Sequence, residues 1–252
     1  MSTQVVFREN VRPGVCLIRM QDEAGRNTFT EALITGLVSA MEAAEQDPSV
    51  KCIVLTGYGP YFATGGTQEA LLAIQAGENS FMDANSGGRN VYSLPMTCRL
   101  PVIAAMQGHA VGGGLAMGLF ADIVILSRES IYSASFMKYG FTPGFGSTCI
   151  FPEKLGRALG TEMLLTANTY HGADLEKRGV PFEVHPRAVV VERALEVAES
   201  LAEKPRRSLE LLKAHLAADI LARIPDVTEK ELRMHDETFH LPEVREKIMS
   251  LY

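Results

Sequence analysis

Two glycine-rich segments are the parts of this sequence whose residue types and spacing could do chemistry. Residues 61–67 read YFATGGT and residues 108–115 read GHAVGGGL, and each lies between a predicted buried strand and a predicted helix. Glycine permits positive φ angles and lets a ligand or a second backbone approach closely. The free N–H groups at such a turn point outward and can receive negative charge. Each segment is therefore a place where negative charge could bind.

Neither segment taken alone is specific, because most glycine turns of this kind are only tight turns. Neither matches the phosphate-binding patterns G-x-x-x-x-G-K-[ST] or G-x-G-x-x-G, so nucleotide phosphate binding is not indicated. No His, Asp or Glu cluster has the spacing of metal ligands, and no metal site is expected.

Histidine suits proton transfer near neutral pH without a large pKa shift, and the sequence has six of them. His235 and His240 both fall on the last predicted helix of the tail. Five residues at the helical step place them about 140° apart. They therefore cannot both face one site.

Short apolar strands alternate with helices around the glycine segments. This alternation favours an α/β layered fold whose sheet is buried on both faces. Thr30 is the expected N-cap of the first helix. The predicted strands span 14–20, 51–56, 101–106 and 123–126, and the predicted helices span 30–45 and 115–120.

The chain changes character near residue 190, where helical periodicity takes over. We expect a core of residues 1–190 and a C-terminal helical region of residues 191–252. Segment 76–89 is polar and glycine-rich, and we expect a mobile loop there. The predicted tail helices span 189–203, 207–222 and 227–240, with Pro205, Pro225 and Pro242 as stops.

The composition of the 252 residues is that of an ordinary globular protein, with 46% hydrophobic and 21% charged residues. The 24 Lys and Arg against 30 Asp and Glu give a net charge of −6, which disfavours nucleic acid as a partner. The first residues, MSTQVVFREN, lack the long apolar core of a signal peptide, and no apolar run reaches the ~18 residues that a membrane span needs. We expect a cytoplasmic protein with no membrane partner, whose four scattered cysteines stay reduced.

Several longer stretches resemble the crotonase (enoyl-CoA hydratase/isomerase) superfamily. They are FATGGTQE at 62–69, PVIAAMQGHAVGGGLAMGLFADIVIL at 101–126, YGFTPGFGST at 139–148 and HGADLEKRGVPFEV at 171–184. The resemblance covers nearly the whole chain. It implies a spiral of ββα units with a C-terminal helical region, assembled as a homotrimer. It also implies that the backbone amides of Gly66 and Gly113 form an oxyanion hole for a thioester carbonyl.

The two glutamates that hydratases of this superfamily use are missing. Carried over by position, they fall on Ala116 and Phe136. With Phe141, these residues predict an apolar pocket without acids, in which a hydratase would lack its acid–base catalyst. Such a pocket favours an acidic acyl chain, because like charges about 4 Å apart repel by about 4 kcal/mol at an effective dielectric constant of 20.

This pattern is most similar to the decarboxylating crotonases of polyketide β-branching cassettes, of the bacillaene-pathway type. The resemblance implies a 3-methylglutaconyl thioester on the phosphopantetheine of an acyl carrier protein, and no cofactor. Loss of the distal carboxylate as CO₂ would give a dienolate, and reprotonation would give a 3-methylcrotonyl-type product. In that subgroup a histidine of the tail helix reaches over the pocket. His240 is the better match, with Asp236 placed to orient it.

One departure from the subgroup concerns the partner of the substrate carboxylate. Some members carry a Tyr and a Lys on the helix after the first glycine turn, where this sequence has Ala70 and Ile74. Gln68, Lys138 and Arg89 are the candidates to replace them.

Two alternative functions stay open from the sequence. A Δ3,Δ2-enoyl thioester isomerase would use the same oxyanion hole, since that hole serves any dienolate. A non-catalytic crotonase scaffold would only bind a carrier protein.

Overall fold

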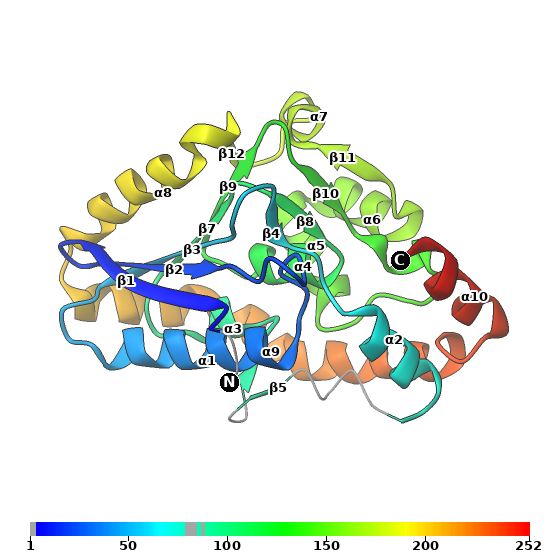
Figure 1. The fold of residues 1–252 in the computed structure, drawn as a ribbon. Coiled ribbons are helices and arrows are strands. Elements are labelled where there is room, and N and C mark those ends of the chain that lie inside the picture. Colours follow the sequence, from blue (N-terminus) through cyan, green and yellow to red (C-terminus); the bar gives the residue numbers. More distant parts are fainter. Residues whose placement is uncertain (1–3, 79–84, 87–88) are drawn as a thin grey trace.

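The computed structural model describes residues 4–78, 85–86 and 89–252. Most of the loop predicted at 76–89 lies outside the described residues. The architecture is mixed α/β with two main sheets, in line with the layered α/β fold expected from the sequence (Figure 1).

The larger sheet has six strands in the order β1-β2-β3-β7-β9-β12. β1 pairs with β2 in antiparallel fashion, and the other neighbours are parallel. Its strands are Val6–Arg12 (β1), Val15–Met20 (β2), Cys52–Thr56 (β3), Val102–Met106 (β7), Ile123–Ser127 (β9) and Glu183–His185 (β12).

The smaller sheet has the order β11-β10-β8-β4, and its β4, β8 and β10 are parallel. Its strands are Tyr61–Ala63 (β4), His109–Val111 (β8), Ile131–Ser133 (β10) and Thr169–His171 (β11). Asn85–Ser86 (β5) and Arg89–Asn90 (β6) form a separate ribbon. β4 and β8 run directly into the two glycine turns, so this sheet positions the site.

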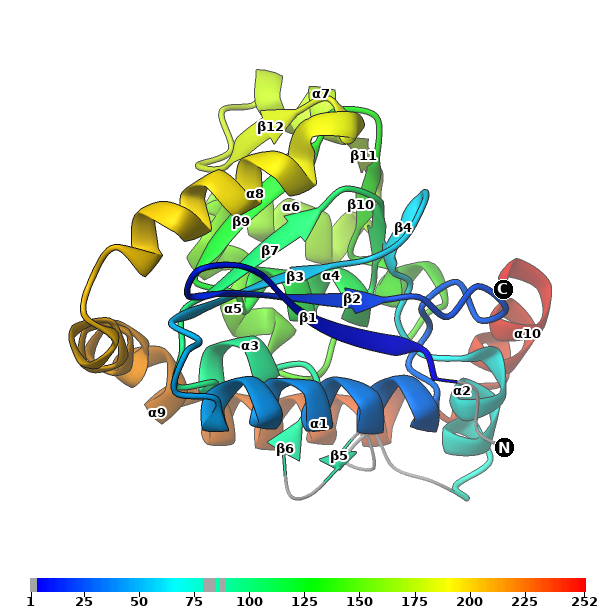
Figure 2. The same cartoon turned by 60° about the vertical axis from the view of Figure 1, so that its left-hand side comes forward.

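Helices cover both faces of the larger sheet (Figures 1 and 2). α8 packs on one face, α1 and α4 lie toward the other, and α10 lies beside α2. The helices are Glu31–Gln46 (α1), Gln68–Gln75 (α2), Leu94–Thr97 (α3), Gly113–Leu119 (α4), Ser147–Leu155 (α5), Arg157–Thr166 (α6), Gly172–Lys177 (α7), Arg187–Ala202 (α8), Arg206–Thr238 (α9) and Pro242–Leu251 (α10), with the 3₁₀ turn Ser135–Lys138 (η2).

Alternation along the central strands explains why both faces are covered. Cys52 and Val54 of β3 pack with Val190 of α8, whereas Ile53 and Leu55 enter the main core on the other face. Successive side chains of a strand point to opposite faces of the sheet. A fully apolar strand must therefore be covered on both faces. The predicted buried strands are thereby confirmed.

The first predicted helix is confirmed together with its cap. The Thr30 hydroxyl accepts a hydrogen bond from the Leu33 amide at 3.2 Å, as an N-cap side chain does. The predicted stop at Pro225 is wrong, because α9 continues through it to Thr238. A proline inside a helix removes one backbone hydrogen bond. The packing of α9 against α3 and α5 holds it on both sides of that break.

Candidate active site

The first glycine turn follows β4 and is held by a neighbouring segment. Gly65 has a φ of +82°, which suits glycine, and its carbonyl accepts a hydrogen bond from the Phe29 amide at 2.7 Å. In a trans peptide the carbonyl and the next N–H point in opposite directions. The Gly66 amide therefore points away from Phe29, toward the cavity that Gly66 lines.

The second glycine turn follows β8 and begins α4. Gly112 has a φ of +54°, and its amide donates to the Ser133 carbonyl at 2.8 Å. Gly113 is the first residue of α4, so its N–H has no acceptor inside the helix. A Cβ on Gly114 would lie 2.1 Å from the Ala63 carbonyl oxygen, which explains why glycine is required there.

The two turns meet because β4 and β8 are parallel neighbours that end at the same edge. A Cβ placed on Gly65 would lie only 3.3 Å from the amide nitrogen of Gly113. Within the described residues, neither the Gly66 amide nor the Gly113 amide donates a hydrogen bond to the protein. The fold thus brings two unused amide donors to one cavity.

The cavity between the turns is small, at about 60 Å³, and mostly apolar and aromatic. Of the described residues that line it, none has an Asp, Glu, Lys, Arg or His side chain. Its hydroxyl groups belong to a threonine, a serine and three tyrosines. The lining residues are Thr64, Gly65, Gly66, Leu71, Tyr92, Val111, Gly112, Gly113, Ser135, Phe136, Tyr139, Phe141, Phe145 and Tyr252.

The tyrosines of the cavity are neutral hydrogen-bonding groups near pH 7. Burial raises the pKa of Tyr92 and of Tyr139 above the ordinary value for a phenol. Burial also raises the pKa of Tyr252 to about 12. A neutral lining of this kind can stabilise an anion by hydrogen bonds without adding a charge of its own.

Four of the eight predicted site residues lie together in this cavity. Gly66 and Gly113 supply the amides, and Phe136 and Phe141 form part of the wall, with their rings 6.3 Å apart in an edge-on arrangement. Both phenylalanines are buried.

The structure places three other predicted substrate-binding residues outside the cavity lining. Ala116 is buried within α4, one turn below the lining. The Gln68 side chain donates to the Ile248 carbonyl at 3.1 Å, joining α2 to α10. Lys138 is exposed to solvent. Arg89, considered for the substrate carboxylate, instead pairs with the buried Glu45 at 2.9 Å.

His240 is not where the sequence analysis placed it. It lies beyond the end of α9, is exposed, and its Nδ1 is 2.9 Å from the Gln75 carbonyl oxygen. The physical reason is the helical phase, which puts His235 and Phe239 on the buried face of α9 and turns His240 outward.

His235 is the histidine of α9 that reaches the wall of the cavity. Its ring packs edge-on against Phe141, with the ring centres 6.4 Å apart, and its Nε2 is 2.7 Å from the Thr142 carbonyl oxygen. A carbonyl only accepts, so this nitrogen carries a proton. Burial lowers the pKa of His235 below the ordinary histidine value.

Sequence reasoning missed four aromatic residues that line the cavity, namely Tyr92, Tyr139, Phe145 and Tyr252. Tyr139 and Phe145 lie in the family-like segment 139–148, which was a usable signal. Tyr92 comes just after the polar segment 76–89, and Tyr252 is the last residue of the sequence. No local pattern marks either of them.

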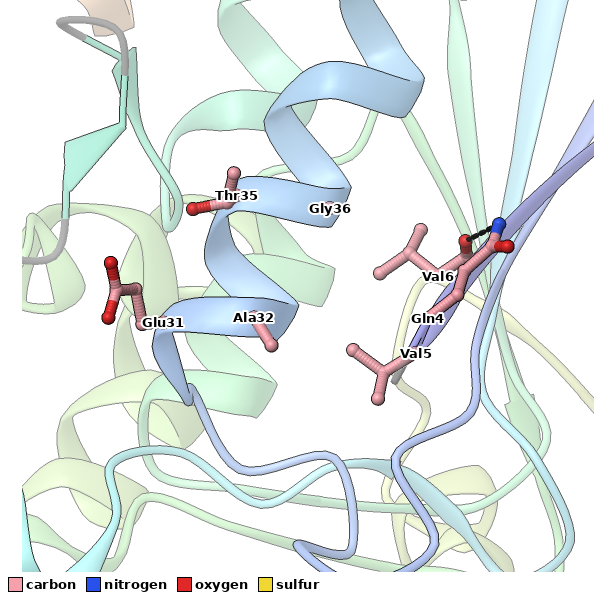
Figure 3. Close-up of a pocket in the computed structure, with 7 residues that line it drawn as sticks. All are labelled: Gln4, Val5, Val6, Glu31, Ala32, Thr35 and Gly36. Carbon is pink, nitrogen blue, oxygen red and sulfur yellow. Dashed lines mark hydrogen bonds between the residues drawn. The ribbon is translucent and has the colours of Figure 1, made fainter. Parts of the chain in front are cut away.

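A larger hollow of about 480 Å³ lies between β1 and the start of α1 (Figure 3). Val5 and Val6 face the helix, whereas the side chains of Glu31 and Thr35 point away from β1 (Figure 3). Because no polar groups converge there, this hollow is a poor candidate for a site.

Metal-binding groups and membrane-spanning helices would indicate other classes of function. The described residues contain no group of three or more His, Cys, Asp or Glu residues arranged to hold a metal ion. No helix within the described ranges is long and apolar enough to cross a membrane.

Comparison with known proteins decides the family. The profile of the enoyl-CoA hydratase/isomerase family matches residues 10–252. The chain belongs to this family.

Relatives narrow the activity within this crotonase family. The chain is 54% identical to the bacillaene synthase decarboxylase PksI of Bacillus subtilis (strain 168), over 100% of this chain and 99% of that protein. A solved structure from a dehydratase/decarboxylase enzyme couple of polyketide β-branching has a TM-score of 0.95 at 54% identity, covering 98% of this chain and 96% of that chain. The ECH2 decarboxylase domain of CurF from Lyngbya majuscula has a TM-score of 0.94 at 40% identity, covering 99% and 100%. The chain is a crotonase-fold decarboxylase of polyketide β-branching.

Proposed function

We propose that this decarboxylase acts on a 3-methylglutaconyl thioester carried by an acyl carrier protein, and that Gly66 and Gly113 hold the dienolate oxygen. The observation that carries the proposal is the pair of unused amide donors in one cavity whose described lining has no acidic side chain. Donors that are fixed before reaction stabilise an oxygen that gains charge in the transition state.

The chemical step needs no cofactor. The bond between the distal carboxylate and its neighbouring carbon breaks, and CO₂ leaves. The electron pair of that bond spreads through the conjugated chain to the thioester oxygen, which becomes the dienolate oxygen. A proton then returns to carbon and gives the 3-methylcrotonyl-type thioester.

The absence of acids at positions 116 and 136 supports this reaction over hydration. Ala116 and Phe136 cannot activate or deliver water. Aromatic walls such as Phe136 and Phe141 also solvate a carboxylate poorly, which favours its release as neutral CO₂.

The proton that completes the reaction is assigned to a histidine of α9. His235 packs against Phe141 of the cavity wall, and it is our choice for the donor. His240, predicted from the sequence, would have to leave the Gln75 carbonyl to reach the cavity. We expect His235→Gln to lower kcat about 100-fold or more, the order expected for loss of a general acid. A comparable loss in His240→Gln, with His235→Gln unaffected, would reverse the assignment.

The assembly and its place in the cell are further parts of the proposal. The family resemblance implies a homotrimer, and the cytoplasm is the place that we expect from the sequence. The exposed leucines of α9 support association, because Leu211, Leu212 and Leu216 are 54%, 56% and 68% exposed. Light scattering on the purified protein measures the mass of the assembly, and a monomer would contradict this part.

Mass spectrometry tests the proposed function. The protein is incubated with 3-methylglutaconyl thioesters of a carrier protein and, separately, of coenzyme A, and the acyl groups are weighed. We expect loss of one CO₂, faster from the carrier protein. An unchanged mass contradicts the proposal. Double-bond migration in a substrate without the distal carboxylate would point to the isomerase, and binding without any reaction would point to the scaffold.

A further inference from the structure

We propose that the hydroxyl of Tyr92 is a third hydrogen-bond donor to the thioester oxygen, beside the amides of Gly66 and Gly113. This inference rests on the proposed function, because it takes the dienolate oxygen to lie at the two amides. Three separate segments of the chain would then converge on one atom.

The first support is the contact between Tyr92 and Gly113. A Cβ on Gly113 would lie 2.3 Å from Cε1 of Tyr92 and 3.1 Å from its hydroxyl oxygen. The hydroxyl edge of the ring therefore lies directly against Gly113, whose amide opens into the cavity. An oxygen that accepts from this amide lies within the region that the Tyr92 hydroxyl can reach.

The second support is the rigid placement of the ring. Tyr92 stacks on Phe145, with ring centres 3.7 Å apart at 17°, and meets Phe29 edge-on at 5.0 Å. The residue is only 4% exposed. Rotation of the O–H bond is then the main remaining freedom, so the donor is in place before the substrate arrives.

The third support is a comparison with the other buried tyrosines. The Tyr132 hydroxyl accepts from the Ser127 amide at 2.7 Å and donates to the Met106 carbonyl at 2.8 Å. The Tyr170 hydroxyl donates to Glu162 at 2.7 Å. Within residues 4–78, 85–86 and 89–252, the Tyr92 hydroxyl forms no hydrogen bond. Buried tyrosine hydroxyls usually have a partner, so this one is available for a ligand.

The environment favours a hydrogen bond over proton transfer. Burial without a charged neighbour raises the pKa of Tyr92, so the phenol keeps its proton near pH 7. Tyr252 is less suited to the role, because its hydroxyl already donates to the Gly66 carbonyl. Tyr139 stacks on Phe141 instead of lying against a glycine turn.

The test compares Tyr92→Phe with Tyr170→Phe, which removes a hydroxyl that bonds Glu162 outside the cavity. We expect Tyr92→Phe to lower kcat by about 10- to 100-fold, less than the roughly 100- to 1,000-fold seen when one main oxyanion donor is lost, because both amides remain. We expect KM to change by less than about threefold, because the bond strengthens mainly in the transition state. The Tyr170→Phe variant should match the wild type. An unchanged kcat in Tyr92→Phe, or a raised KM alone, would overturn the inference.

A second measurement separates this inference from the proposed function. The infrared carbonyl frequency of protein-bound 3-methylcrotonyl pantetheine should be lower in the wild type than in Tyr92→Phe, because a donor weakens the C=O bond. Equal frequencies in the two proteins overturn the inference. A wild type that lowers the frequency but releases no CO₂ refutes the proposed function and leaves the Tyr92 contact standing.

Discussion

The two glycine turns present the same kind of amide, yet they are held in different ways. The second turn is held partly by its own helix, since the Gly112 carbonyl accepts from Ala116 within the first turn of α4, and partly by β10, since the Gly112 amide donates to the Ser133 carbonyl. The first turn is held from a distance. The Gly65 carbonyl is bonded to Phe29, and the Gly66 carbonyl accepts from Tyr252, which is 186 residues away.

The surroundings of the two donors differ as much as their supports. A Cβ on Gly113 would collide with Tyr92, whereas a Cβ on Gly66 would lie 3.5 Å from Leu71, which is ordinary contact. The comparison shows that the Gly113 donor lies in a crowded position at the start of a helix. The other sits in a roomier position that depends on tertiary packing.

The largest expected effect distinguishes the crowded donor at Gly113 from the roomier donor at Gly66. Gly113→Ala puts a methyl group 2.3 Å from the Tyr92 ring, so the ring or the amide must move. We expect kcat to fall about 100-fold or more, as when a preorganised donor is lost. Gly66→Ala is the matched control and should stay within about tenfold of the wild type. Decarboxylation rates on both purified variants measure this, and equal losses would show that the crowding of the second turn is irrelevant.

A smaller effect concerns the distant support of the first turn. Tyr252→Phe removes the hydroxyl that donates to the Gly66 carbonyl while keeping the ring beside Tyr139. We expect kcat to fall several-fold, because one neutral hydrogen bond contributes about 1 kcal/mol. A loss as large as that of Gly113→Ala would mean that Tyr252 contacts the substrate itself.

The positions predicted from the sequence agree with the structure where a residue is marked by its own segment. The turns at Gly66 and Gly113 are marked by glycines after apolar strands, and the structure brings them to one cavity. Phe136 and Phe141 lie in a recognisable stretch and also line it.

The predictions failed where the role depends on how distant segments meet. His235 and His240 lie about 140° apart around the helix, and only the packing of α9 shows that His235 is the buried one. Pro225 was expected to separate two helices. The buried face of the residues before Pro225 therefore could not be used to predict the buried face of the residues after it. Tyr92 and Tyr252 reach the cavity from segments that are far apart in the sequence, without any local signal.

The smallest expected effect concerns how His235, beside the cavity wall, makes the stability of the fold depend on pH. Burial lowers the pKa of His235, so at acidic pH the unfolded chain binds a proton more readily than the folded one. The contribution of His235 to the free energy of unfolding is fully present above the ordinary pKa of histidine. It is lost as the pH falls through the pKa of His235 in the folded protein. Urea unfolding at pH 7.5 and 5.5 should show a decline in the wild type that His235→Gln reduces. An identical decline in both proteins would assign it to other groups.

The measurement that tests the central claim most directly is a crystal structure of the protein with bound 3-methylcrotonyl pantetheine. The account predicts that the thioester oxygen lies within hydrogen-bond distance, about 2.7–3.2 Å, of the amide nitrogens of both Gly66 and Gly113. A thioester oxygen that contacts neither amide would contradict it.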